Sequence, residues 1–382
     1  MLKYNIMINC MGAKLVMKRI IAMLMLIFAI SNSYAFAITI NEDERPTGGW
    51  IYNVEETENL QAFDNTEGSG GFSLNLLTSE EKETTLVPTS EYYGYNALKA
   101  EDDKNGNTRF TSAYSCLLQV LKNRDECVDF TEYGFTISEF DKVYRACNND
   151  IPQFFYLLYG YSYSYQINRG KKIIGEVYPD YITYLNANDN GEEFEKCADD
   201  IIAASGVRSE MSDYDKAIMI HDELAENVAY DYDAAAAYVS ANEIENKDER
   251  NAEIDRLNGI YGHIHSAYGA LVLGSAVCDG YSKAYQYLLY KVGIPSHLVT
   301  GTANGGGHAW NLVCLDGKWY YTDLTWDDSD EYEHIFYSYF NITEEQSIDS
   351  SHIADRPYSL PECTSAEYNY FVKNNKKQFL NV

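Results

Sequence analysis

Three segments decide the fold of this chain: VCDGYSKAY (277–285), GGGHAWNLV (305–313) and KWYYTDLTWDD (318–328). They place a cysteine, Cys278, a histidine, His308, and an acid, Asp323, in a fixed order along the chain. A glycine or an aromatic residue lies within two positions of each of the three, a composition expected of a shaped site that partly excludes water. A thiol nucleophile, its base and a group that orients the base are the roles that these residue types can fill. We therefore interpret the three residues as a candidate catalytic triad.

Cys278 is expected to open a buried helix. Apolar residues recur behind it at helical spacing, at Tyr281, Ala284, Tyr285, Leu288, Leu289 and Val292. Gly293 and Pro295 then stop the helix. A helix N-terminus carries partial positive charge and unpaired N–H groups, which favour thiolate over thiol and offer a donor to an oxyanion. The position of the cysteine therefore suits a nucleophile.

Two strands are expected to follow, at 297–301 and 308–315, with the flexible TANGGG between them. Asp316-Gly317 is the strongest hairpin signal in the chain and joins HAWNLVCL to KWYYTDLTW. The helix that begins at Cys278 and these antiparallel strands together predict an α+β fold.

The hairpin also predicts a contact between the histidine and the acid. A two-residue turn pairs Leu315 with Lys318, and counting back along both strands sets His308 opposite Thr325. Asp323 is then diagonal to His308 on the same face, at about 7 Å. His308 could form a thiolate–imidazolium pair with the cysteine while Asp323 accepts the other ring N–H. Trp310 and Trp326 are expected to wall the site from water.

These segments resemble the core of the transglutaminase-like superfamily, whose fold is similar to that of papain. The resemblance extends upstream to IHDELAENVAYDYD (220–233) and downstream to YFNITEEQ (339–346) and His352, and more weakly to DIPQFFYLLYGYSY (150–163). It implies that the family's nucleophile, histidine and acid are Cys278, His308 and Asp323. It also implies a papain-like core. We expect neither a cofactor nor a metal. Neither the length nor an acidic loop supports the β-sandwich domains and calcium sites of the animal enzymes.

Five segments describe the expected organisation. Residues 1–37 have a basic start, a short apolar run and the small-x-small site Ala35-Phe36-Ala37, which is typical of a cleaved signal peptide, with a retained anchor as the alternative. Residues 38–107 are predicted to be a linker or weakly ordered extension. A mixed N-terminal subdomain (108–205), the catalytic core (206–355) and a C-terminal tail (356–382) follow.

Composition limits the partners. The formal net charge is −29, which disfavours nucleic acid and anionic lipid. We expect a secreted protein with a protein or peptide substrate, cell-surface or wall-associated substrates included, and no stable membrane insertion after cleavage. Seven cysteines remain beyond the signal segment, an odd number that leaves at least one free thiol and allows up to three disulfides. For Cys314, which lies in an apolar strand-like run, a buried free thiol is the alternative.

Other residues have a structural explanation that competes with a functional one. His263 and His265 could ligate a metal, but the sequence offers no third ligand. His221 lies on an apolar helix face and is expected to be a satisfied core histidine. Tyr268 is a candidate second oxyanion donor, and packing is its alternative role.

The expected chemistry is acyl transfer. Cys278 attacks a carboxamide or peptide carbonyl, and an amine or water resolves the thioester. A transglutaminase-like acyltransferase is the first hypothesis. A cysteine peptidase or amidase with the same triad is the second, and a non-catalytic peptide or cell-wall binding module is the third.

Overall fold

The computed structural model describes residues 54–57, 92–328 and 334–376. The predicted signal peptide and most of the predicted linker lie outside these ranges. Within them, no helix combines the length and the apolar character needed to cross a membrane.

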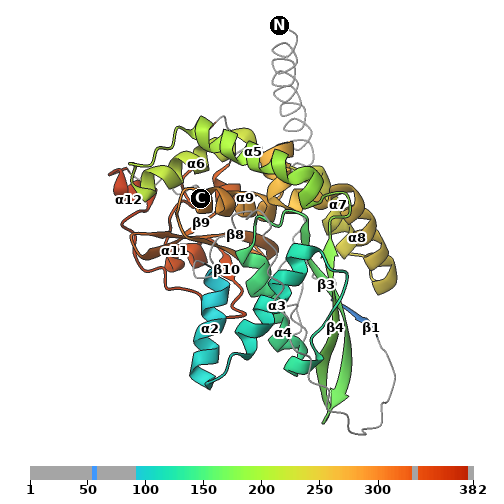
Figure 1. Cartoon of the computed structure of the whole chain (residues 1–382). Coiled ribbons are helices and arrows are strands. Elements are labelled where there is room, and N and C mark those ends of the chain that lie inside the picture. The colour runs from blue at the N-terminus through green and yellow to red at the C-terminus, as the bar shows by residue number, and fades with distance from the viewer. Residues whose placement is uncertain (1–53, 58–91, 329–333, 377–382) are drawn as a thin grey trace, which may run out of the picture.

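An antiparallel sheet of four strands and one buried helix form the centre of the molecule (Figure 1). The strand order is β10 (His352–Ala354), β7 (Ser296–Ala303), β8 (Gly306–Leu315) and β9 (Lys318–Thr322). The helix α9 (Cys278–Lys291) packs on β7 and β8, and its residues from Cys278 to Leu289 are all buried. A helix that is buried on every side belongs to a core. Because this helix packs on an antiparallel sheet, the predicted α+β architecture is confirmed.

Two tight turns set the register of the sheet. Asp316 (φ 49°) and Gly317 (φ 74°) both adopt left-handed conformations, and Leu315 pairs with Lys318 as predicted. The prediction of a flexible TANGGG segment is wrong, because Asn304 (φ 50°) and Gly305 (φ 80°) form a second two-residue turn. Asn-Gly favours such a turn because both residues tolerate positive φ.

The N-terminal subdomain is mixed, as expected. Its helices are α3 (Arg109–Asn123), α4 (Ile137–Asp150) and α5 (Ala187–Ser205), with a 3₁₀ turn η2 (Thr131–Tyr133). Its sheet has the order β1 (Val54–Thr57), β3 (Leu157–Asn168), β4 (Lys171–Tyr181) and β2 (Val128–Asp129). Thr136 and Glu139 form a reciprocal capping box at the start of α4. These helices and strands together make the N-terminal subdomain a mixture of helix and sheet.

The predicted linker is wrong over residues 92–107. Helix α2 (Tyr93–Asn105) occupies this stretch, and the Tyr92 and Leu98 side chains are fully buried. Asp102 accepts hydrogen bonds from the backbone of Phe110 and Thr111, so α2 also supports the start of α3. The strand β1 falls inside the predicted linker as well.

The start of α2 explains why its sequence gave no signal. No local side chain caps this helix. Its first N–H groups instead donate to the buried Asp150 carboxylate, from Gly94 (2.9 Å) and Tyr95 (2.9 Å). Tyr114 Oη donates to the same carboxylate at 3.0 Å, and His297 Nδ1 lies 3.2 Å from it. The capping residue Asp150 is 56 residues from Gly94, so the sequence around the start of α2 does not reveal the cap.

The predicted C-terminal tail is packed rather than free over its described part. Tyr358, Leu360 and Cys363 are buried, and a short helix, α12 (Tyr370–Lys373), follows. Tyr358 Oη lies 3.0 Å from His297 Nε2 on β7. Residues 356–376 therefore cover the edge of the central sheet region rather than leaving it.

The remaining described elements are α6 (Asp213–Asn227), β5 (Ala229–Tyr230), α7 (Tyr232–Asn242), α8 (Lys247–Tyr261), η3 (Gly262–His265), η4 (Gly269–Leu273), β6 (Ser275–Ala276), α10 (Leu324–Asp327) and α11 (Glu344–Asp349). Of these, α6, η3, η4, β6 and α10 pack against α9. The charged stretch 240–256 covers the end of α7, a short turn and most of α8, and it is not wholly solvated. Ile254 and Leu257 are buried against α7, through Ala234 and Tyr238.

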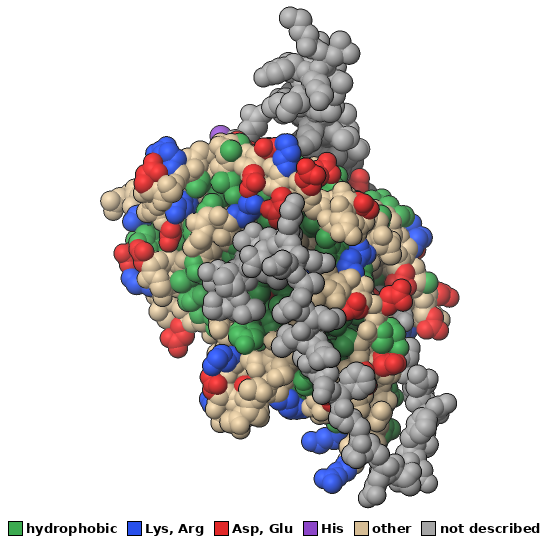
Figure 2. All heavy atoms as spheres, viewed as in Figure 1, with side chains coloured by type: hydrophobic (Ala, Val, Ile, Leu, Met, Phe, Trp, Pro, Cys, Tyr) green, Lys and Arg blue, Asp and Glu red, His purple; other side chains and the backbone are tan. Residues whose placement is uncertain are grey.

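The distribution of charged side chains on the surface does not mark a site. Acidic side chains are spread over the visible face rather than gathered into one patch (Figure 2). All seven cysteines in the described ranges are free thiols: Cys116, Cys127, Cys147, Cys197, Cys278, Cys314 and Cys363. Of the two alternatives, the structure has free thiols rather than disulfides.

The Asp150 network should dominate the attachment of α2. We expect Asp150→Ala to lower the free energy of unfolding by about 3 kcal/mol or more, because it strands several buried donors. Urea unfolding followed by circular dichroism measures the change. Asp103→Ala is the control, since the exposed Asp103 carboxylate pairs with the exposed Lys99 ammonium on the same helix. Equal unfolding midpoints for the two variants would contradict the role of Asp150.

Candidate functional site

Cys278 is the first residue of α9, as the sequence predicts. Its side chain is 1 % exposed and packs with Leu298 of β7 and Ala309 of β8. The first N–H groups of a helix have no partner within the helix, so the thiol lies where donors and positive potential are concentrated.

Hydrogen bonds lock the start of α9 to the sheet. Ser282 Oγ donates to the Ala309 carbonyl at 3.1 Å, and Asn311 Nδ2 donates to the Ser282 carbonyl at 3.0 Å. A Cβ at Gly280 would lie 2.2 Å from the Ile264 carbonyl oxygen, so glycine permits a close approach of η3. The nucleophile helix is thereby fixed relative to the strand that carries the histidine.

His308, on β8, lies between the thiol and the acid. Its Nε2 is 2.6 Å from Asp323 Oδ2, and both side chains are buried. The ring also lies next to the Cys278 thiol, and its charge lowers the pKa of that thiol. Because Nε2 faces the carboxylate, Nδ1 is the nitrogen that faces sulfur. The structure therefore brings together all three residues of the predicted triad.

The route by which Asp323 arrives differs from the prediction. The β8–β9 ladder ends at the Asn311–Thr322 pair, and His308 pairs with Gly301 on β7 instead of Thr325. Asp323 leaves the strand and becomes the N-cap of α10, with its side chain accepting from Trp326 N at 3.3 Å. An aspartate favours such a cap, and the turn into α10 removes the predicted pair.

His352 is a fourth member of the cluster. Its Nε2 lies 2.9 Å from the same Asp323 Oδ2, and its Nδ1 lies 3.1 Å from Ser350 Oγ. From the sequence, His352 is noted only as part of the family resemblance, and no role is predicted for it. It comes from the edge strand β10, whose pairing with β7 is a tertiary contact, so spacing alone could not reveal it.

Aromatic rings surround the histidines. Trp326 lies 5.5 Å from the His308 ring and 4.4 Å from the His352 ring, centroid to centroid, and Trp310 lies 5.8 Å from His308. Trp310 is buried and Trp326 is partly exposed. Both tryptophans adjoin His308, as expected.

The cluster favours an ionic form of the histidine. Burial alone would lower the pKa of His308. The negative charge and hydrogen bond of Asp323, together with the Cys278 thiol, outweigh burial and raise the pKa of His308 to about 10. Burial raises the pKa of Asp323, yet the two histidines hold it well below its usual range. Burial raises the pKa of the Cys278 thiol, and His308 opposes that rise.

The other histidines have separate partners. His263 Nδ1 lies 2.9 Å from Tyr184 Oη, whereas His265 Nδ1 lies 2.9 Å from Asp279 Oδ1, so the two do not share one ligand site. His221 is fully buried, as expected, and its Nδ1 lies 3.0 Å from Asp222 Oδ1. It is not fully satisfied, because its Nε2 lies 3.4 Å from Asp327 Oδ2 and forms no hydrogen bond among the described residues.

One group of described residues has donors close enough for a metal. These are His308, Asp323 and His352, whose donor atoms lie within 4.8 Å of one another. Their nitrogens already bond the shared carboxylate oxygen. A metal would have to replace both hydrogen bonds, so the arrangement suits a histidine–carboxylate relay better.

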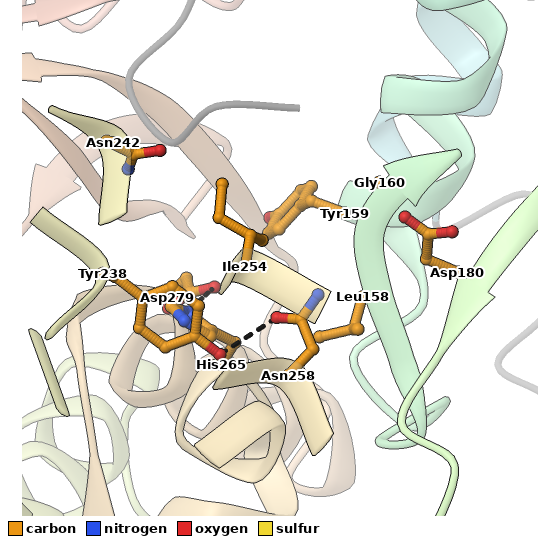
Figure 3. Close-up of a pocket in the computed structure, with 10 residues that line it drawn as sticks. All are labelled: Leu158, Tyr159, Gly160, Asp180, Tyr238, Asn242, Ile254, Asn258, His265 and Asp279. Carbon is orange, nitrogen blue, oxygen red and sulfur yellow. Dashed lines mark hydrogen bonds and ion pairs between the residues drawn. The ribbon is translucent and has the colours of Figure 1, made fainter. Parts of the chain in front are cut away.

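A pocket opens beside Asp279, the residue after Cys278 (Figure 3). Tyr159 and Asp180 line it from the β3–β4 hairpin, and the His265–Asp279 pair lies opposite them. The other lining residues are Leu158, Gly160, Tyr238, Asn242, Ile254 and Asn258. Tyr159 also packs against the Cys278 cluster. The pocket thus shares a wall with the candidate nucleophile.

Residues 201–324 match the model of the transglutaminase-like superfamily, a range that contains Cys278, His308 and Asp323. This segment belongs to that superfamily. Members of this superfamily are generally cysteine enzymes. At the level of the family, the match therefore supports a cysteine-dependent enzyme.

Two solved structures resemble the chain. One, described as a TGase, has 18% identity and a TM-score of 0.32, over 45% of this chain and 46% of its own. The other, a candidate cysteine protease from Cytophaga hutchinsonii, has 15% identity and a TM-score of 0.21, over 41% of this chain and 52% of its own. The chain thus spans about half the length of each. A search of curated proteins finds no match.

Removing the His308 imidazole should make the Cys278 thiol less reactive at neutral pH. Without the imidazole, burial and the negative charge of Asp279 are opposed only by the backbone of Ala309, so the pKa of the thiol rises further. For His308→Gln we expect the pH profile of alkylation by iodoacetamide to move to higher pH, with a loss of about tenfold or more at pH 7, since one pKa unit is a tenfold change in thiolate.

The control for this measurement is His263→Gln, which replaces a half-buried histidine bound to Tyr184. Rates of Cys278 alkylation are followed by mass spectrometry between pH 5 and pH 10. A profile for His308→Gln that coincides with that of the control would show that the imidazole does not control the thiol.

Proposed function

We propose that this protein is a secreted cysteine acyltransferase that acts on carboxamide or peptide carbonyls of protein substrates. The observation that carries the proposal is the buried arrangement of Cys278 at a helix N-terminus, with the His308 ring between the thiol and Asp323. Nucleophile, base and orienting group are each within reach of the next.

The proposed first step forms a thioester. The Cys278 thiolate attacks the carbonyl carbon of a glutamine-type carboxamide, and the carbonyl π electrons move to oxygen. The N–H groups at the start of α9 stabilise the resulting oxyanion. The intermediate collapses as the C–N bond breaks, and the His308 imidazolium gives its proton to the departing ammonia.

The second step regenerates the thiol. A primary amine gives a proton to His308 and attacks the thioester carbonyl, the C–S bond breaks, and the cysteine recovers its starting state. Water can follow the same course and would yield a carboxylate. The rings of Trp310 and Trp326 beside His308 limit access of water, which favours an amine acceptor.

The pocket of Figure 3 is the proposed place for a part of the substrate. Two tyrosine rings, Tyr159 and Tyr238, and two amides, Asn242 and Asn258, line it. Aromatic surface with a few polar groups is typical of sites that hold a ligand beside reacting atoms. An extended protein or peptide substrate could place one side chain there.

Amine incorporation tests the proposal. A glutamine-bearing protein is incubated with a fluorescent primary amine, and the label on the protein is quantified. We expect labelling by the wild type and a loss of about 10³-fold or more in Cys278→Ala. Cys314→Ala, which removes a half-buried thiol on the same sheet, should retain full labelling.

Other results would favour the alternatives. Release of ammonia or peptide cleavage without incorporation of the amine would make the protein an amidase or a peptidase. Binding of a peptide or wall polymer that is equal in the wild type and in Cys278→Ala, with no turnover, would support a non-catalytic module. Undiminished labelling by Cys278→Ala would rule out Cys278 as the nucleophile.

Export is a separate part of the proposal, supported by the signal-like pattern of residues 1–37. The expected result is a mature N-terminus just after Ala37 in protein recovered from the culture medium. Mass spectrometry of the N-terminal peptide measures it. A chain that starts upstream of Ala35 would show that the segment is retained.

A further inference from the structure

Tyr230 holds a fixed place beside the start of α9. It is the second residue of β5, which pairs in parallel with β6, and its partner there is Ala276, two residues before Cys278. Backbone bonds flank this pair on both sides, from Ala229 N to Gly274 O (3.0 Å) and from Asp231 N to Ala276 O (3.0 Å). The backbone of Tyr230 therefore cannot move independently of the nucleophile loop.

The side chain of Tyr230 faces the site. Its ring centroid lies 6.4 Å from that of Tyr281, one turn after Cys278 on α9. Burial raises the pKa of Tyr230, and so do the negative charges of Cys278 and Asp279 and, more weakly, that of Asp323. The β5–β6 register and the ring contact with Tyr281 thus place Tyr230 beside the first turn of α9, and its hydroxyl keeps its proton at neutral pH.

The hydroxyl of Tyr230 is also available. The side chain is partly exposed, and its Oη has no hydrogen-bond partner within the described ranges. Neighbouring hydroxyls are engaged, since Tyr281 Oη donates to the Val228 carbonyl at 3.0 Å. A protonated, unpartnered donor beside a nucleophile is what a developing oxyanion requires.

We propose that the Tyr230 hydroxyl is the second oxyanion donor, acting together with the backbone N–H of Cys278. This role rests on the acyl transfer proposed above. As the thiolate attacks, the C–S bond forms and the carbonyl π electrons move to oxygen. Tyr230 Oη donates a hydrogen bond to that oxygen and retains its proton. When the C=O bond re-forms and the leaving group departs, the donor is unchanged.

Two other donors are less suitable. Tyr268, the candidate from the sequence, donates to Glu193 Oε2 at 2.9 Å and lies 3.3 Å from Asn190 Nδ2, both on α5, so the structure assigns it a packing role. Trp310 Nε1 has no partner among the described residues, but the nitrogen is buried. A substrate oxygen cannot reach it without opening the core.

Two reagents separate an oxyanion donor from a residue that only affects the thiol. A p-nitrophenyl ester acylates Cys278 through a tetrahedral oxyanion and releases p-nitrophenolate. Iodoacetamide alkylates the same thiol by displacement of iodide at a saturated carbon and forms no oxyanion. The ester rate should depend on Tyr230, whereas the alkylation rate should not.

The variant is Tyr230→Phe, which keeps the ring and removes a hydroxyl that has no described partner. We expect its acylation rate constant to fall by about 10²-fold, with little change in KM, the size of effect seen when one oxyanion donor is removed. Alkylation by iodoacetamide should change less than about twofold, because the thiolate fraction sets that rate.

Tyr232→Phe is the matched control. Its ring lies 4.8 Å from that of Tyr230 and is 45% exposed. This variant should keep both rates. Circular dichroism and unfolding midpoints verify that both variants fold.

Each outcome has a distinct meaning. Unchanged acylation in Tyr230→Phe, or an equal loss of acylation and alkylation, would overturn the oxyanion role alone. A wild-type protein whose thiol is alkylated but not acylated by the ester would overturn the proposed acyl transfer, and the role of Tyr230 with it.

Discussion

One carboxylate oxygen, Asp323 Oδ2, accepts hydrogen bonds from the His308 and His352 rings, and the arrangement of the site depends on it. A buried carboxylate is stable only when charge and hydrogen bonds compensate its loss of water. Here two imidazoles provide that compensation. The other oxygen caps α10, so one side chain both ends the last strand of the sheet and orients the base.

The local parts of this design could be predicted from the sequence. The periodic residues after Cys278 predicted a buried helix, and the structure has it. Asp316-Gly317 predicted a two-residue turn, and the Leu315–Lys318 pair confirms its register. These features are local, because a helix period and a turn are determined within about ten residues. The contact of His308 with Asp323 could be predicted for the same reason, although its geometry is set by the cap of α10.

Features that depend on distant partners could not be predicted. Helix α2 has its cap in Asp150, and the sequence before it therefore resembles a linker. His352 joins the site through the pairing of β10 with β7. Tyr230 approaches Cys278 through a strand pair of two residues, too short to leave a pattern. In each case the information lies in the tertiary contact rather than in the spacing of residues.

Several buried hydrogen bonds join the transglutaminase-like segment to residues outside it, and they determine whether the segment could fold by itself. The segment ends at residue 324, yet His352 comes after it. Before its start, the Asn149 carbonyl accepts from Gln286 Nε2 of α9 at 2.9 Å, and Arg145 binds Thr300 Oγ1 of β7 at 2.7 Å. A gene fragment trimmed to the matched range would leave buried polar groups without partners on both flanks. A fragment that keeps these contacts must therefore also include α4 before the matched range and β10 after it.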